Sequence, residues 1–318
     1  MVWQAVDPAL WQGRDDTAEG VLARRWHQQV LIREADAPLP SGGGHALLGF
    51  ASDAGVRRNG GRPGAVEGPT ELRRMLANLA WHHTRVLDAG DVRVVDDALE
   101  VAQAEFGTQV ASLLGAGLMP IGLGGGHEIA FASWQGLAAD LSRRSLHPPR
   151  VGILNLDAHL DLRSAAAPHS GTPFRDIAMD CERRGWDFRY ACFGVAEAAN
   201  TGALYAEAAR LGVWIEHDGE LTPERCTGLL ARLHEWLVPL DAVYLTLCLD
   251  AFPAAAAPGV SAPAALGIDP RIALAIIRLL RDSRRLKVAD VAELCPALDI
   301  DRRTARLAAR LVWELARD

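Results

Sequence analysis

The 318-residue sequence has no uncharged apolar run long enough to cross a bilayer and no excess of positive charge. Its first residues, MVWQAVDPALWQGRDD, also lack the basic start and the apolar stretch of a secretory signal. The formal net charge of −7 argues against an attraction to nucleic acid or to anionic lipid. We therefore expect a cytoplasmic protein that has neither a membrane nor a nucleic acid as its partner.

The cysteines of the sequence are few and never spaced as CxxC. They are odd in number and scattered, at Cys181, Cys192, Cys226, Cys248 and Cys295. This pattern is typical of a reducing compartment and excludes a disulfide framework or a zinc finger of the usual spacing.

Apolar strands bounded by glycine or polar residues recur along the chain and are separated by amphipathic helical stretches. Because these strands are apolar on both faces, they predict a three-layer α-β-α fold with a mainly parallel sheet. No repeat or low-complexity linker divides the sequence, so we expect a single domain over residues 1–318, with residues 1–40 as a peripheral N-terminal arm. The predicted strands are 45–50, 118–125, 151–157, 242–250 and 285–294, and the predicted helices are about 70–80, 101–117, 221–237 and 302–317.

Ligands of open parallel sheets bind at the carboxyl ends of the strands, which directs attention to the polar residues there. His127 follows a predicted strand and three glycines in GLGGGHEIA. Glycines allow the backbone to pass close to a buried centre and to turn sharply. Taken alone, this segment is equally compatible with a phosphate loop or a tight turn, although the Lys-Ser/Thr of a P-loop does not follow.

Two further strand ends carry alternating polar side chains. Asp157, His159 and Asp161 alternate in NLDAHLDLR, and Cys248 and Asp250 do so in LTLCLDAFP. A period of two places alternate side chains on one face, so each set can converge on a point. Carboxylates and imidazole suit a divalent cation. The alternative, a surface loop with incidental charges, is disfavoured because an apolar strand leads directly into each set.

GGGH, DAHxD and a late strand with two ligand-type residues two positions apart, in this order, resemble the arginase (ureohydrolase) family. The similarity extends from about Leu47 to the end of the chain. The resemblance implies an arginase-like fold, a site for two Mn²⁺ ions and a homo-oligomer. It places His127 and Asp161 at one metal, His159 and Asp250 at the other, and Asp157 at both.

Cys248 stands at the remaining ligand position, where the family has a bridging aspartate. An aspartate can bridge two metals with separate oxygens, whereas a cysteine offers a single sulfur atom. Thiolate is also a soft ligand that favours zinc and other late metals over manganese. We therefore expect Cys248 to favour Zn²⁺ or a single metal, or to lie inert beside one retained ion.

Within the family, the chain resembles the formimidoylglutamase branch most. The shared features are GVRRNGGRPGA, Arg163 directly after DAHxD, and SGTPF from Ser170 to Phe174. The resemblance implies metal-dependent hydrolysis of N-formimidoyl-L-glutamate to L-glutamate and formamide, a step of histidine breakdown. It gives Asp161 a role in proton relay and Glu293, in ADVAELCP, the role of holding the amidinium group.

The dicarboxylate substrate implied by this resemblance requires cationic and polar partners. Arg163 follows a metal-ligand position by two residues, and a guanidinium grips a carboxylate with two hydrogen bonds. The expected substrate-binding residues are Asn59, Arg62, Arg163, Ser170 and Glu293. For the arginines of the glycine-rich loop, Arg62 among them, a solvated surface charge is an equally good interpretation.

Three alternatives stay open from the sequence. The chain could hydrolyse another guanidino or amidino compound, such as agmatine. It could be a catalytically impaired member because of Cys248, or a binding protein that retains only the fold. A cavity shared by Glu293, Arg163 and the metal-ligand positions would favour the enzyme over the binding protein.

Overall fold

The computed structural model describes residues 2–35, 37–82 and 85–317, and one ten-stranded sheet organises this part of the chain. The strand order is β1-β4-β3-β5-β10-β9-β6-β7-β8, with β2 also paired to β4. The pairs are parallel except for β1 with β4. The strands are β1 (Trp3–Gln4), β2 (Leu31–Ile32), β3 (His45–Ala51), β4 (Val86–Arg93), β5 (Met119–Gly124), β6 (Val151–Leu156), β7 (Arg189–Val195), β8 (Trp214–His217), β9 (Ala242–Cys248) and β10 (Leu286–Ala292).

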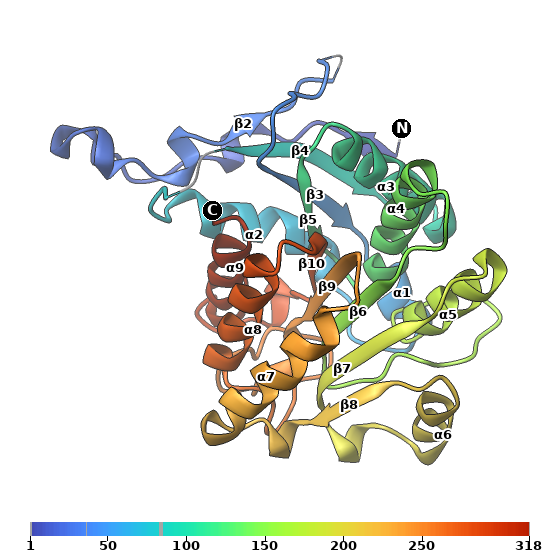
Figure 1. Cartoon of the computed structure of the whole chain (residues 1–318). Helices are drawn as coiled ribbons and strands as arrows, with labels where there is room; N and C mark the ends of the chain where they lie inside the picture. Colours follow the sequence, from blue (N-terminus) through green and yellow to red (C-terminus); the bar gives the residue numbers. More distant parts are fainter. Residues whose placement is uncertain (1, 36, 83–84, 318) are drawn as a thin grey trace.

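Helices cover both faces of this sheet (Figure 1). One apolar cluster joins the sheet to α2, α7, α8 and α9, and a second joins it to α3, α4, α5 and α6. Leu47 and Leu48, neighbours on β3, belong to different clusters because successive strand residues point to opposite faces. The predicted three-layer fold is confirmed. The helices are α1 (Ala54–Arg58), α2 (Gly68–Ala77), α3 (Leu99–Gly115), α4 (Ile129–Arg144), α5 (Pro173–Arg184), α6 (Gly202–Arg210), α7 (Cys226–Leu237), α8 (Pro270–Asp282) and α9 (Arg303–Leu315).

The five predicted strands correspond to β3, β5, β6, β9 and β10, whereas the sequence did not predict β1, β2, β4, β7 or β8. β4 was hidden by its two aspartates, Asp88 and Asp91, which are buried in the structure. Both pair with Arg73 of α2, whose Nε lies 2.7 Å from Asp88 Oδ2 and whose NH1 lies 2.7 Å from Asp91 Oδ1. Until such a partner is known, a buried carboxylate looks like a surface charge.

The N-terminal segment, described over residues 2–35 and 37–40, runs along the β4 edge of the sheet. It supplies β1 and β2, and its Trp26 side chain is fully buried. Trp11 Nε1 donates a hydrogen bond to Asp88 Oδ2 over 2.8 Å. Another part of the segment, drawn in blue, projects from the body of the molecule (Figure 1) and exposes Val21 and Leu22 by 71% and 93%. The segment therefore combines a packed part with a projecting part.

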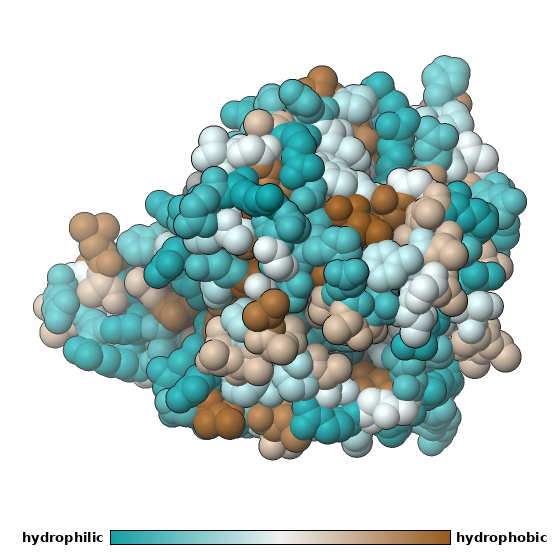
Figure 2. Space-filling view, turned by 90° about the horizontal axis from the view of Figure 1, so that it is seen from below, coloured by the Kyte–Doolittle hydropathy of each residue, from teal (hydrophilic) through white to brown (hydrophobic). Residues whose placement is uncertain are grey.

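Hydrophilic and hydrophobic residues are interspersed on the face that Figure 2 shows. Among the described residues, no helix combines the length and the apolar character that crossing a membrane would need.

Candidate metal centre and substrate cavity

Four neighbouring strands, β5, β10, β9 and β6, end at the same edge of the sheet. His127 follows β5 and Glu293 follows β10, while Cys248 is the last residue of β9 and Asp250 lies just beyond it. Residues 157–161 follow β6. Because β10 and β9 are inserted between β5 and β6, chain segments far apart in sequence deliver their side chains to one place.

A cavity of about 230 Å³ opens at this edge. Its lining combines nearly all of the predicted metal-ligand positions with the predicted substrate residues other than Arg62, and adds residues from the loop after β9. The lining includes Asn59, His127, His159, Asp161, Arg163, Ser170, Asn200, Cys248, Asp250, Ser261, Ala262 and Glu293. The Ala/Pro-rich stretch 251–265 thus contributes Ser261 and Ala262 to the wall of the cavity.

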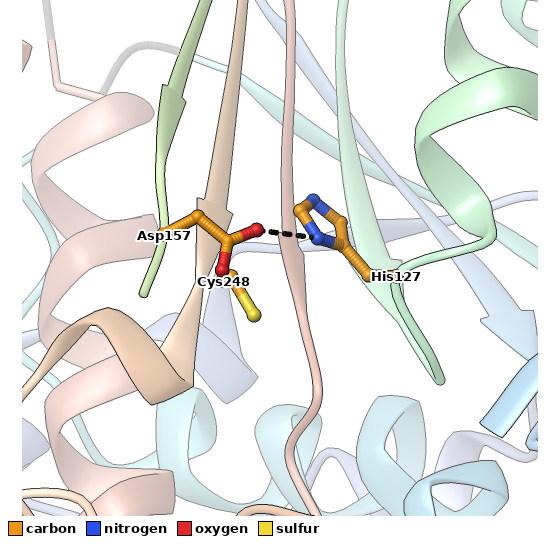
Figure 3. A group of neighbouring side chains, drawn as sticks. All are labelled: His127, Asp157 and Cys248. Atoms are coloured by element: carbon orange, nitrogen blue, oxygen red, sulfur yellow. Dashed lines mark ion pairs between the residues drawn. The ribbon is translucent and has the colours of Figure 1, made fainter. Parts of the chain in front are cut away.

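One group of possible metal ligands joins His127, Asp157 and Cys248, whose donor atoms all lie within 4.8 Å of one another. Figure 3 shows these side chains converging from three strand ends, with the His127 ring turned toward the Asp157 carboxylate. His127 Nδ1 lies 2.9 Å from Asp157 Oδ2 and 2.9 Å from Asp161 Oδ2. The three side chains are buried, and His127 and Cys248 also line the cavity.

A second group joins Asp157, His159 and Asp250, again with donor atoms within 4.8 Å. His159 Nδ1 lies 3.2 Å from Asp250 Oδ2 and 3.5 Å from Asp157 Oδ1. Asp157 belongs to both groups and points one carboxylate oxygen toward each. This arrangement has the form of a two-cation site with a shared carboxylate.

The backbone at this edge is unusually constrained. A Cβ atom on Gly125 would lie 1.8 Å from the carbonyl oxygen of Ser52, which explains why a glycine precedes His127 so closely. Asp161 and Glu293 adopt φ values of 48° and 71°, in the left-handed region that non-glycine residues rarely occupy. Such conformations cost about 1–3 kcal/mol each and persist where the surroundings enforce them, commonly at functional sites.

Several buried carboxyl groups lie close together at this site, and their burial and proximity raise the pKa values of two of them. Burial and the charge of Asp157 raise the pKa of Asp161 to about 6. Burial, followed by the charges of Asp250 and Glu128, raises the pKa of Glu293 to about 8. The raised pKa values show that the charged forms of these buried carboxyl groups are unfavourable, and a nearby cation would compensate for this. Asp250 Oδ1 is also buried without a hydrogen-bond partner among the described residues. The donor set therefore fits divalent cations.

The Cys248 side chain is 1% exposed, and burial followed by the charge of Asp157 raises the pKa of its thiol well above the usual range. A thiol with a raised pKa is a poor nucleophile. Metal coordination, in contrast, takes the deprotonated thiolate, so a cation at this position would displace the proton. The environment therefore suits Cys248 better as a ligand or as an inert core residue than as a covalent catalyst.

The predicted substrate residues divide into two sets. Arg163, Ser170 and Asn59 line the cavity, and Asn59 Nδ2 donates to Ser170 Oγ over 3.1 Å. Arg62 does not line it, because its guanidinium donates to the carbonyl oxygens of Ser261 and Val260 over 2.8 and 2.7 Å. Contact between Arg62 and a substrate would require the guanidinium to leave these carbonyls, which at present anchor the wall of the cavity.

Sequence reasoning missed several buried polar residues behind the ligands. His127 Nε2 lies 3.0 Å from Thr246 Oγ1, and Asn155 Nδ2 donates to Asp157 Oδ2 over 3.0 Å. Thr246 continues the same alternation as Cys248 on β9, so the period of that strand could have revealed it. Asn200 carries no such signal, because it lies in a loop after β7, a strand that was not predicted.

The chain is similar in sequence to known proteins over nearly its whole length. A sequence model of the Arginase family matches residues 44–317. The chain is 53% identical to the formimidoylglutamase of Aromatoleum aromaticum, covering 98% of this chain and 93% of that protein. It is 54% identical to the formimidoylglutamase of Ralstonia nicotianae, covering 96% and 94%. This chain belongs to the arginase family.

Solved structures show the same fold. The formiminoglutamase of Trypanosoma cruzi with Mn²⁺ superposes with a TM-score of 0.75 at 25% identity, covering 89% of this chain and 94% of that one. The arginase of Bacillus subtilis superposes with a TM-score of 0.72 at 22% identity, covering 86% and 98%. The predicted arginase-like fold is thereby confirmed.

Proposed function

We propose that this protein hydrolyses N-formimidoyl-L-glutamate to L-glutamate and formamide, as a step of histidine breakdown. The observation that carries this proposal is that Glu293 and Arg163 line one cavity together with ligands from both candidate metal groups. An amidine group and a carboxylate of the same substrate can therefore be held at once. The similarity to formimidoylglutamases over nearly the whole chain supports the choice of substrate.

The proposed metal ligands are His127, Asp157, His159, Asp161, Cys248 and Asp250, which would together hold two cations. Manganese is supported by the Mn²⁺ named with the Trypanosoma cruzi structures, whereas the sulfur of Cys248 favours zinc. When bound, the cations supply Lewis acidity, which lowers the pKa of water and stabilises developing negative charge.

The protein's own residues orient the reaction in this proposal. Glu293, held by a 2.8 Å hydrogen bond from the His127 backbone N–H to its Oε1, would pair with the positively charged amidinium and aim its carbon at the metal side of the cavity. Asp161, at the cavity wall, would accept a proton from the attacking water and pass it to the departing amine. Arg163 would bind a substrate carboxylate, with Ser170 and Asn59 beside it.

We further propose a single domain, a cytoplasmic location and a homo-oligomeric state. One continuous sheet from β1 to β8 supports the single domain. Sedimentation velocity on the purified protein tests the oligomeric state directly: a monomer at micromolar concentration would contradict it.

The second candidate function is hydrolysis of a guanidino compound, because the same metal geometry and Glu293 could hold a guanidinium. The two candidate reactions can be distinguished because they release different products, formamide in the first and urea in the second. We expect the metal-loaded protein to release formamide from formimidoylglutamate and no urea from arginine, agmatine or a guanidino acid. Urea release without formamide release would replace the proposed substrate with the second candidate.

A further inference from the structure

The segment that carries three of the proposed metal ligands, Ala158 to Leu160 with its neighbours Asp157 and Asp161, lies beyond the end of β6. Strand pairing alone holds it weakly: Asp157 N–H donates to Phe193 O over 2.9 Å, and Ala196 N–H donates to Ala158 O over 3.0 Å. The segment nevertheless ends in the left-handed conformation of Asp161. Something besides the sheet must therefore fix its shape.

Asn200 supplies that constraint. Its Oδ1 accepts a hydrogen bond from Leu160 N–H over 3.0 Å, and its Nδ2 donates to Ala158 O over 2.9 Å. Nδ2 also donates to Ala196 O over 3.0 Å, which ties the segment to the loop after β7. Asn200 is buried, with 8% of its surface exposed. Its two contacts on the segment are the residues on either side of His159.

Only an amide can make this set of contacts, because the position requires one acceptor and two N–H donors. Two side chains of β7 complete the hold on the segment. Tyr190 Oη donates to Leu160 O over 3.2 Å, and Cys192 Sγ donates to His159 O over 3.4 Å. Every carbonyl from Ala158 to Leu160 thus has a donor, and the ring of His159 is left to face Asp157 and Asp250.

We infer that Asn200 is a positioning residue that sets the metal affinity of the site without touching a metal. The inference rests on the proposed metal centre. Its physical basis is that a ligand loop held in one shape binds a cation without first being ordered, whereas a loosened loop must lose conformational freedom on binding. Outer residues that orient metal ligands typically change affinity by about 10–100-fold when they are replaced.

The test is the dissociation constant of Mn²⁺, measured by calorimetry on the full-length protein. We expect Asn200→Ala to weaken Mn²⁺ binding by about 10–100-fold, with activity restored by excess Mn²⁺. Asn78→Ala is the matched control, since Asn78 Oδ1 likewise accepts a backbone N–H, from Arg14 over 2.8 Å, but lies away from the site. Its Mn²⁺ affinity should equal that of the wild type.

Tyr190→Phe provides a second variant, which keeps the aromatic ring but removes the hydroxyl that donates a hydrogen bond to Leu160 O of the same segment. It should weaken Mn²⁺ binding in the same direction but less, and it decides the matter if Asn200→Ala does not fold. Wild-type affinity in Tyr190→Phe and in any folded Asn200→Ala overturns the inference, as does a loss of activity that excess Mn²⁺ fails to restore. If the wild-type protein itself binds no metal, the proposed metal centre fails instead.

Discussion

Cys248 is the residue at which this chain departs from the ligand pattern that its resemblance to the arginase family implies, because an aspartate is expected there. Its sulfur lies with the donor atoms of His127 and Asp157, within 4.8 Å of both. If the thiolate is a ligand, Co²⁺-substituted protein should show a sulfur-to-cobalt charge-transfer absorption in the near ultraviolet. Cys248→Ser should abolish that absorption, whereas Cys226→Ser, at the start of α7, should leave it intact. An unchanged spectrum in Cys248→Ser would identify the cysteine as an inert core residue.

Glu293 is proposed to act through its negative charge on the amidinium group. Glu293→Gln keeps the shape and the acceptor for the His127 backbone N–H but removes the charge. Since electrostatic groups aimed at the reacting centre are worth roughly 10²–10³ in rate, we expect kcat/KM to fall by about that factor. Metal content should stay the same, as should the activity of Glu235→Gln on the exposed side of α7. Loss of bound metal in Glu293→Gln would point to a structural role.

Arg163 is proposed to recognise a carboxylate of the substrate. Arg163→Met should lower kcat/KM for formimidoylglutamate by about 10- to 150-fold, the equivalent of a lost charge-assisted hydrogen bond of ~1.5–3 kcal/mol. An amidine without carboxylates should be turned over equally by both proteins, because it never uses the guanidinium. A parallel loss on both substrates would show that Arg163 supports the site rather than the substrate.

At the scale of elements, the buried ion pairs between α2 and β4 make a stability prediction. Burial acts to lower the pKa of Arg73, but the charges of Asp88 and Asp91 on either side of it raise that pKa overall. Arg73→Ala would strand two buried carboxylates, and we expect a loss of about 3–5 kcal/mol in the free energy of unfolding. Urea denaturation of Arg74→Ala is the control. The Arg74 side chain is 53% exposed and pairs with Glu71 over 3.5 Å, so its loss should cost about 0–1 kcal/mol. Equal losses in the two variants would contradict this account of the α2–β4 contact.

Some of the strands and their site residues could be predicted from the sequence, and others could not. β5, β6 and β9 could be predicted with their site residues, because an apolar run flows directly into alternating polar side chains in β6 and β9. The insertion of β10 and β9 between β5 and β6 could not, since strand order depends on long-range packing. β4 was missed because it contains the buried Asp88, whose partner Arg73 lies on another element. β8 was missed because it is only partly buried and carries no strong apolar signal. β7 was not predicted, so the role of Asn200 in the loop after it could not be predicted either.

At the scale of the whole molecule, two helical layers cover the faces of the sheet, and the site lies at the carboxyl ends of its strands. The walls of the cavity come from the segments that follow β3, β5, β6, β7, β9 and β10, which are distant in sequence. The cavity thus depends on the complete fold. Removing bound metal with a chelator should abolish turnover while leaving this fold intact, because both apolar clusters lie between the sheet and its helices.

The central claim, a metal-dependent formimidoylglutamate hydrolase with Cys248 at its metal centre, is tested most directly by one reconstitution experiment. The chelated protein and its Cys248→Asp variant are loaded with Mn²⁺ or Zn²⁺, and bound metal and released formamide are measured together. We predict formamide release by the wild-type protein with bound metal, and a shift toward Mn²⁺ over Zn²⁺ in Cys248→Asp. Metal-loaded protein that releases no formamide in either form, with either metal, would contradict the account.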